Sequence, residues 1–552
     1  MAVPFARFKF NTLTTVLLMG PALAWAQVAA SPTVQAEPSG QATASAAPLR
    51  ELGKPEDDIK LDVRAYQVDG LPDASVARLA AITAPFVGTA RSYEDLVNAA
   101  NAVTLYMQRE LGYYVGFAYL PEQQNKDGIV HIAVLEGRLD QVQLNWSDDL
   151  PVRREVVERH LAALKQGDVL RVNEVERVVF LINDLQGIRT RFEIQEGRDA
   201  GTATLVVTPA KEERISGRVE LDSLGSRYTG SGRVSGAVTV ASPFGHGDAL
   251  TVNALSSFTR GLAFGGLSYV SPVGASGLKL GAAVSKVRYQ LDKDDFPSDV
   301  DGTVVAASGF ALYPVIRSRN LNLFSLLSYE NKRFEDSLAG ASLRKRSDDV
   351  QAGVVGDFRD NWLSGAVNTY ELSWLQGHMK FDASDAATAG LKANFGKATL
   401  GYSRLQSLVT GRLQLYARYK GQVANTTLDA TERFALGGPA SVRAFAPGEA
   451  SSDTAHVLTA ELRFLPPEAW LGRMARDMVF SAFYDWGHAR SAPTSDLPSQ
   501  SNTLSGYGLG VIWARPSDFS LRLNLAWRAA GESLADPNTH EPRANAVLTK
   551  NF

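Results

Sequence analysis

The feature that most constrains this chain is a long run of alternating segments in its C-terminal part. After Lys211 the sequence holds about sixteen segments of roughly ten to fourteen residues in which apolar and polar side chains alternate. The clearest example alternates Phe519, Leu521, Leu523, Leu525 and Trp527 with Ser520, Arg522, Asn524 and Ala526. An even number of such long strands predicts a closed antiparallel barrel that spans a membrane, because lipid tolerates no unpaired backbone edge. A soluble β-sandwich is the alternative, and the strand length argues against it.

The N-terminus has the pattern of an export signal. Basic residues precede an apolar run over 13–23, and a small-x-small cleavage pattern ends just before Gln27. The run is shorter than the ~20 residues of a spanning helix, so a cleaved signal peptide over 1–26 is favoured over a membrane anchor. Residues 27–58, rich in Ala, Ser, Thr, Gln and Pro, predict a flexible linker. The chain has no cysteine, so burial or sheet closure has to stabilise it in place of disulfides.

Between the linker and the barrel, the sequence predicts two compact modules with the same β-α-α-β-β order. The first spans 59–137 and begins with one strand around Leu61 to Tyr66. Its second helix starts at a capping box made by Ser92 and Asp95. A turn at Asp127-Gly128 precedes its last strand.

The second module spans 138–209, and Asn173 with Glu176 predicts the cap of its second helix. Each module has about 75 residues, which is an ordinary domain size. A free sheet edge on such a module can accept an extended peptide as an added strand, so the sequence leaves open whether the modules bind a partner or serve as spacers.

The barrel region, 210–552, contains one connection of roughly thirty residues, 424–455, that is not plainly strand or helix. It includes the sequence TERFALGGPASVRAFAPG, which is too apolar for a solvated tail and has Arg443 at its tip. Counting strands from the N-terminal modules places this connection on the outside as loop six. We expect it to fold inward. The chain ends at Phe552, which resembles the terminal signature of outer-membrane barrels that is read during their assembly.

A partner for Arg443 follows from the alternation in the thirteenth strand. There, Phe483, Asp485 and Gly487 face the lumen and the intervening residues face lipid. A carboxylate inside a barrel needs water or a cation, and an arginine from the loop offers a bidentate partner. Glu461 on the neighbouring strand is a second candidate.

These residues resemble a known pair of motifs. Val442-Arg443-Ala444-Phe445 is similar to the V-R-G-[YF] motif at the tip of loop six in the superfamily that includes BamA, with alanine where glycine is usual. The run from Phe483 to Gly487 is similar to the [FG]-x-D-x-G partner motif of that superfamily. The runs 119–123, 127–128 and 134–137 resemble the first POTRA domain of TpsB two-partner secretion transporters of the ShlB/FhaC/HecB haemolysin secretion/activation type, and 221–230 resembles their first barrel hairpin.

The resemblance implies a monomeric transporter in the outer membrane of a Gram-negative bacterium, with periplasmic POTRA modules. These would capture an unfolded TpsA-type exoprotein, an adhesin or haemolysin-like protein, for export through the barrel without nucleotide hydrolysis. Outer-membrane lipid and the barrel assembly machinery would be its other partners. The resemblance also implies that Val442, Arg443 and Phe445 form the loop-six tip, and that Phe483, Asp485 and Gly487 receive it.

Other functions find less support. The sequence has no G-x-S-x-G, H-E-x-x-H or P-loop motif, so we expect no catalytic residue, metal or cofactor. A net charge of −3 gives no electrostatic reason for nucleic acid binding. A surface barrel enzyme and a passive porin remain alternatives, and the porin has no use for the two modules. An outer-membrane protein or autotransporter assembly factor of the same superfamily is the nearer alternative.

Overall fold

The structure is a computed structural model, and it describes residues 60–552 except 73, 122, 124–126, 295–298, 339–340, 383–390, 492–499, 516–517 and 534–540. The signal peptide and linker predicted over 1–58 therefore lie outside the described residues. Contacts between residues divide the described chain at Glu212 into an N-terminal α+β unit and a C-terminal barrel. In the described part of the chain, no helix is both long enough and apolar enough to cross a membrane.

The first module of the N-terminal unit carries two helices on a three-stranded sheet. In the sheet, β2 pairs in parallel with β5, and β4 pairs with the other edge of β5 in the antiparallel sense. The elements are β1 (Lys60–Val63), β2 (Ala65–Asp69), α2 (Val76–Thr83), η2 (Ala84–Phe86), β3 (Gly88–Ser92), α3 (Tyr93–Arg109), β4 (Phe117–Tyr119) and β5 (Ile129–Leu135). The predicted capping box is confirmed, since the Ser92 side chain accepts from the Asp95 N–H while Asp95 accepts from the Ser92 N–H.

The single strand predicted around Leu61 to Tyr66 is wrong. It is broken at Arg64 into β1 and β2, which belong to different sheets. β1 pairs instead with β3, a strand that the alternation did not reveal. The Arg64 N–H donates to the carbonyl of Gly128, so the turn at Asp127-Gly128 holds the chain at this break. Asp127 and Gly128 both have positive φ, as a tight turn of this kind requires.

The second module repeats the topology of the first. Its sheet has the order β6–β8–β7, again with one parallel and one antiparallel pair. Its elements are β6 (Arg138–Leu144), α4 (Arg154–Leu161), α5 (Val172–Asn183), β7 (Ile188–Glu196) and β8 (Thr202–Lys211). The predicted helix cap at Asn173 is wrong, because the N-cap of α5 is Arg171, two residues earlier, and no side chain caps the helix. The Asn173 carboxamide accepts from the N–H of Glu174 instead.

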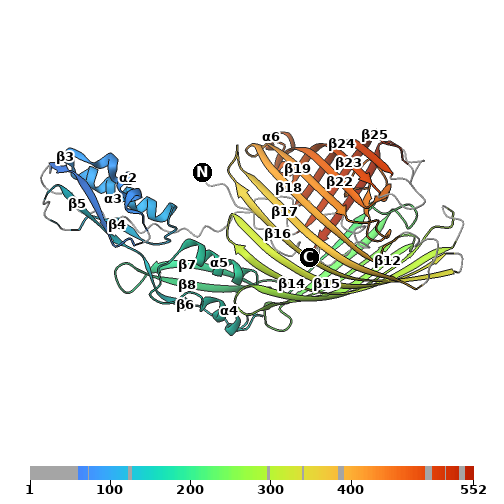
Figure 1. Cartoon of the computed structure of the whole chain (residues 1–552), viewed down its shortest axis with the longest axis horizontal. Helices are drawn as coiled ribbons and strands as arrows, with labels where there is room; N and C mark the ends of the chain where they lie inside the picture. The colour runs from blue at the N-terminus through green and yellow to red at the C-terminus, as the bar shows by residue number, and fades with distance from the viewer. Residues whose placement is uncertain are drawn as a thin grey trace. The chain divides into compact units, whose positions relative to one another are not determined.

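The C-terminal unit is a closed antiparallel barrel of sixteen strands, which confirms the predicted count (Figure 1). β26 pairs with β9 to close it. The strands are β9 (Ile215–Asp222), β10 (Arg233–Ala241), β11 (Ala249–Ser257), β12 (Leu262–Val273), β13 (Leu278–Gln290), β14 (Val300–Arg317), β15 (Leu321–Leu338), β16 (Ala341–Asp360), β17 (Ala366–Phe381), β18 (Asn394–Val409), β19 (Leu413–Ala424), β22 (Thr454–Phe464), β23 (Met478–Arg490), β24 (Ser501–Arg515), β25 (Phe519–Ala530) and β26 (Arg543–Asn551).

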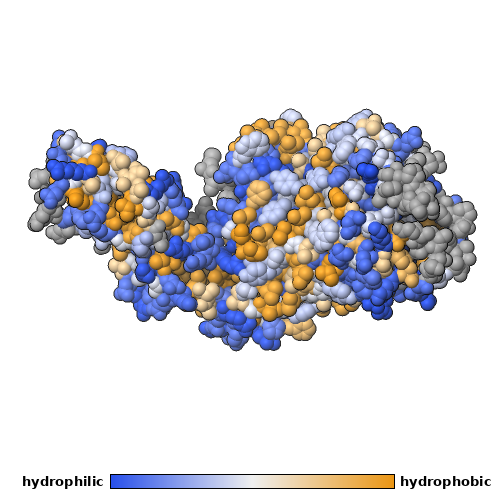
Figure 2. All heavy atoms as spheres, viewed as in Figure 1, coloured by the Kyte–Doolittle hydropathy of each residue, from blue (hydrophilic) through white to orange (hydrophobic). Residues whose placement is uncertain are grey.

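The alternation places apolar side chains on the outside of the barrel. On β25, Leu523 and Leu525 are exposed, as the pattern predicted, and so are Leu458 and Leu462 on β22. Figure 2 shows hydrophobic residues spread over the visible outer wall of the barrel. Exposed leucines at every second position are what a lipid-facing surface requires, because burial in lipid replaces burial in a protein core.

Candidate functional site in the barrel lumen

Loop six, residues 425–453, is a folded hairpin rather than an irregular connection. A short stem is formed by β20 (Phe434–Leu436) and β21 (Ala450–Ser452), which pair in the antiparallel sense. The residues beyond this stem, 437–449, are called the tip. Gly437 and Gly438 open the tip with φ of 89° and 88°, a backbone conformation that side chains other than glycine rarely adopt.

The stem and tip are buried against one wall of the barrel. Apolar residues of the loop pack with inward-facing residues of β22 to β25 in one cluster: Leu436, Val442, Ala444, Phe445, Ala450, Ala455, Val457, Phe483, Ala489, Leu504 and Ala526. Phe445 is 1% exposed and Val442 is fully buried. A barrel lumen is ordinarily polar, and this cluster is a small apolar core within it. Because water is excluded from the contacts between loop and wall, the core stabilises the tip inside the lumen.

Arg443 at the tip is bound to Asp485 on β23. Its Nε donates to Asp485 Oδ2 at 2.8 Å and its Nη2 donates to Asp485 Oδ1 at 3.0 Å. The backbone N–H of Arg443 also donates to Oδ2, at 3.1 Å. The carboxylate therefore fixes both the side chain and the backbone of the tip, and charge-assisted bidentate pairs are among the strongest hydrogen bonds in proteins.

Glu461 on β22 binds the same guanidinium from a second direction. Arg443 Nη1 donates to Glu461 Oε2 at 3.0 Å, while Arg463 Nε donates to Glu461 Oε1 at 2.9 Å. The ring of Phe483 lies under the Arg443 guanidinium, with 3.3 Å between the guanidinium carbon and the ring centroid. Burial lowers the pKa of Arg443, but Asp485 and then Glu461 raise it to a net value above the ordinary one, so the side chain stays charged.

Further contacts hold the backbone of the tip. Arg418 Nη2 on β19 donates to the carbonyl of Ala440 at 2.8 Å, and Asn545 Nδ2 on β26 donates to the carbonyl of Arg443 at 3.3 Å. The tip therefore contacts strands from β19 to the last strand of the barrel. In the part of the chain that the structure describes, no group of three or more histidine or carboxylate side chains is placed to hold a metal ion.

Comparison with known proteins places the chain in a family. The model for haemolysin secretion/activation proteins of the ShlB/FhaC/HecB type matches residues 201–512, and a ShlB-type POTRA domain matches 61–137. The chain belongs to this family. It is a TpsB-type two-partner secretion transporter of the Gram-negative outer membrane, and its POTRA domain is periplasmic.

Relatives and solved structures agree with the family. The heme/hemopexin transporter protein HuxB of Haemophilus influenzae strain 86-028NP is 24% identical over 506 residues, which covers 89% of this chain and 88% of HuxB. The outer membrane transporter CdiB of Escherichia coli O6:K15:H31 is 26% identical over 519 residues, with 88% and 85% covered. The structure of CdiB from Escherichia coli is 19% identical and has a TM-score of 0.70, with 98% of this chain and 97% of CdiB covered.

A structure of BamA from Haemophilus ducreyi that lacks POTRA domains 1–3 shares the fold. Its TM-score is 0.54 at 12% identity, with 90% of this chain and all of that chain covered. The ShlB/FhaC/HecB family is a family of transporters rather than of enzymes. These comparisons establish the family and the fold. The roles of single residues are inferred from the geometry of the lumen.

The structure explains the one residue that departs from the tip motif of the superfamily. Ala444 stands where glycine is usual, and its φ is not positive, so this position does not need the conformational freedom of glycine. Its methyl group packs against Gly506 on β24, where an added Cβ would lie 2.6 Å from the Ala444 Cβ. Alanine at 444 is therefore accommodated by glycine at 506.

Two arginines of this transporter's site were not predicted from the sequence. Arg463 shares Glu461 with Arg443, and Arg418 holds the tip backbone. Arg463 had a usable signal, since it lies two residues after Glu461 on an alternating strand and must face the same way. Arg418 had none, because its partner is a backbone carbonyl.

Proposed function

We propose that this transporter exports one large TpsA-type exoprotein from the periplasm to the cell surface. The periplasmic modules capture the passenger while it is unfolded, and the barrel then conducts it outward. The observation that carries this proposal is the loop-six tip clamped inside the lumen by Arg443. The tip lies inside the closed barrel, so in this proposal its position decides whether a passenger chain can pass.

Capture rests on the sheet edges of the two modules. The POTRA match covers 61–137, and the module after it has the same strand order, so we assign 138–209 as a second POTRA domain. β7 forms one edge of the second sheet and offers nine residues of backbone. An extended passenger can add to such an edge through main-chain hydrogen bonds, which bind without regard to sequence.

Export in this proposal uses no nucleotide. The modules and the barrel lie beyond the inner membrane, where no nucleotide pool exists, and the sequence has no P-loop motif. Folding of the passenger at the cell surface makes its return through the barrel unfavourable and so biases its movement outward.

Each residue of the lumenal site has a separate role in the proposal. Arg443 organises the tip and Asp485 anchors it, while Glu461 holds the free side of the guanidinium. Phe483 supports the guanidinium from below, and Gly487 leaves room for the stem of the loop. Val442 and Phe445 add the apolar contact that keeps the tip in the lumen.

Deletion of this transporter tests the proposal. We expect one large surface or secreted polypeptide to disappear while other outer-membrane proteins keep their levels, as measured by proteomics of the outer membrane and the medium. The intact transporter supplied in trans should restore that polypeptide. A general loss of outer-membrane proteins would instead identify an assembly factor, and a passenger-independent conductance with no lost polypeptide would identify a porin.

A further inference from the structure

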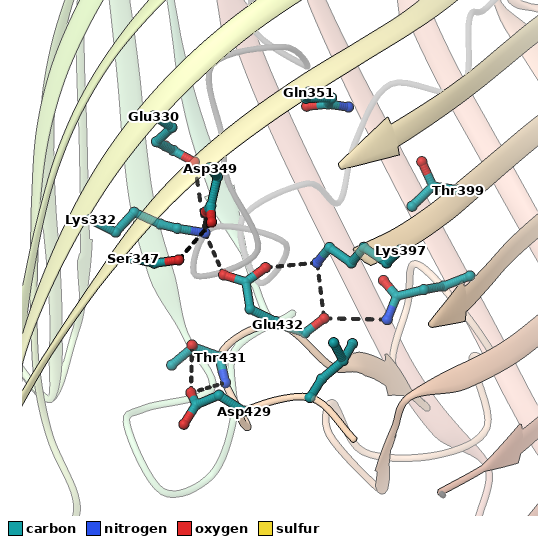
Figure 3. Close-up of polar contacts among 12 residues, drawn as sticks. Glu330, Lys332, Ser347, Asp349, Gln351, Lys397, Thr399, Asp429, Thr431 and Glu432 are labelled. Carbon is teal, nitrogen blue, oxygen red and sulfur yellow. Dashed lines mark hydrogen bonds and ion pairs between the residues drawn. The ribbon is translucent and has the colours of Figure 1, made fainter. Parts of the chain in front are cut away.

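A second cluster of charged residues binds loop six far from its tip. Glu432, before the stem, is fully buried and lies between two lysines of the barrel wall (Figure 3). Its Oε2 accepts from Lys397 Nζ on β18 at 2.8 Å, and its Oε1 accepts from Lys332 Nζ on β15. Lys397 Nζ also donates to the backbone carbonyl of Glu432, at 2.9 Å. Side chain and backbone of one loop residue are thus held by two strands.

The lysines themselves are fixed by the barrel. Lys332, with 1% of its side chain exposed, lies 2.7 Å from Asp349 Oδ2 on β16, and Ser347 donates to the other oxygen of Asp349 at 2.6 Å. Burial raises the pKa of Glu432, but the two ammonium groups outweigh burial and leave the pKa below its ordinary value. Glu432 therefore stays charged between the two ammonium groups, and its removal leaves these ammonium groups buried without the carboxylate that they share.

The residues on either side of Glu432 bind the same region. Asp429 accepts from Lys345 Nζ on β16 at 2.9 Å. Leu428 is fully buried in an apolar cluster with three side chains of β17 and β18, which are Leu375, Met379 and Phe395. Its N–H donates to Asp453 Oδ1 at 2.8 Å, which joins the outgoing and returning arms of the loop. We call residues 428–433 with Asp453 the root of loop six.

The root and the tip use different parts of the barrel wall. The charged partners of the root lie on β15, β16 and β18, which precede the loop in the order of strands. The carboxylates that bind Arg443 lie on β22 and β23, which follow it. No side chain belongs to both sets of ion pairs. The ion pairs of loop six therefore fall on two arcs of the barrel, which meet at β19. On that strand Gln422 donates to the carbonyls of Glu432 and Asp453 in the root, and Arg418 donates to the carbonyl of Ala440 in the tip.

We propose that Glu432 is a second, independent anchor of loop six, a positioning residue that holds the root while Arg443 holds the tip. The inference deepens the proposed export function and rests on it, because a loop attached at two points can release one while it keeps the other. The ion pairs of the root and those of the tip share no side chain, so the two sets are expected to contribute nearly additively to holding loop six in the lumen. Loss of the root anchor should therefore free residues 428–433 and leave the tip in place.

Thiol labelling tests this directly, because the chain has no cysteine of its own. Leu428→Cys reports on the root and Ala444→Cys on the tip, and both positions are buried. In the Leu428→Cys background, Glu432→Gln should raise the rate of maleimide labelling by about tenfold or more, since the amide cannot neutralise two ammonium groups. In the Ala444→Cys background, the same substitution should change the rate by less than about twofold.

Glu330→Gln is the matched control. Glu330 lies 3.8 Å from the same Lys332 but belongs to β15 and not to the loop. The Glu330→Gln substitution should leave the labelling rates of Leu428→Cys and Ala444→Cys unchanged. This control separates loss of the anchor from a change of charge around Lys332. Heat-modifiable migration in gels confirms that each variant is a folded barrel.

Three outcomes would overturn the proposal: Leu428→Cys stays protected when Glu432 is changed, Glu330→Gln has the same effect as Glu432→Gln, or root and tip are released together. Labelling requires no passenger. A failure of the export function would thus appear in the deletion experiment and leave this result unaffected.

Discussion

Leu436 in the stem of loop six occupies the space that a side chain at Gly487 would need. A Cβ placed on Gly487 would lie 2.4 Å from Leu436 Cδ1 and 3.1 Å from Val442 Cγ2. The φ of Gly487 is not positive, so the requirement for glycine here is spatial and not conformational. The last residue of the lumenal motif is thus explained by the loop that packs on it.

Substitution of Gly487 by valine should drive loop six away from the wall. The added side chain meets both Leu436 and Val442, and overpacking of a close-packed site typically costs about 1–3 kcal/mol. We expect a larger single-channel conductance in planar bilayers and faster proteolysis within loop six. Gly265→Val on the outer face of β12, where no atom lies within 4 Å of an added Cβ, should behave as wild type. Equal conductance of the two variants would contradict this explanation.

Phe552 adds one residue pair to the seam that closes the barrel. Its N–H donates to the carbonyl of Gly217 at 2.9 Å and its carbonyl accepts from the Gly217 N–H at 2.7 Å. These bonds extend the seam between β26 and β9, which has only five other residue pairs. Deletion of Phe552 should therefore lower the amount of assembled barrel several-fold, measured by heat-modifiable migration, whereas Phe552→Tyr should assemble normally. Full assembly of the deletion variant would show that the seam does not need this residue.

Stability of the N-terminal unit should fall in mild acid because of His160. This imidazole is 2% exposed in the core of the second module, and its Nδ1–H donates to the Val156 carbonyl at 2.8 Å. Burial lowers the pKa of His160 in the folded state. The unfolded chain therefore binds the proton first as the pH falls through about 6.5, so stability present above that pH is lost below it, at about 1.4 kcal/mol for each unit of pKa difference.

Urea denaturation of the fragment 60–212 between pH 5 and pH 8 measures this loss, with Trp146 as its one tryptophan. Asp69 and Asp140 have lowered pKa values, because of hydrogen bonds from His131 and from Arg198 respectively. Their protonation therefore affects the free energy of unfolding only at lower pH. His160→Leu should remove most of the pH dependence of the free energy of unfolding between pH 5 and pH 7. An unchanged slope in that variant would assign the effect to other groups.

The barrel was predictable because lipid and lumen impose a strict period of two on each strand. Strands such as β25 therefore lie within a residue or two of the segments that the alternation indicated. β14 to β16 were underestimated, since they run for 18 to 20 residues, beyond the length that lipid constrains. Lys345, near the start of β16, lies in the part that the alternation missed.

The lumenal site was predictable only where a motif marked it. Arg443 and Asp485 stood out through their likeness to paired motifs, and alternation gave the direction of Asp485. The root of loop six gave no such signal, because Glu432 and Lys332 are 100 residues apart and each is an ordinary polar residue in its own segment. Only closure of the barrel brings them together.

The most direct test of the account is secretion by an Arg443→Ala variant. The account predicts that export of the passenger is lost while the barrel remains inserted and heat-modifiable, because Asp485 and Glu461 lose the guanidinium that they share. Arg344→Ala, which removes an exposed arginine paired with Glu335, is the control and should secrete normally. Wild-type secretion by Arg443→Ala would contradict the central role of the tip in export.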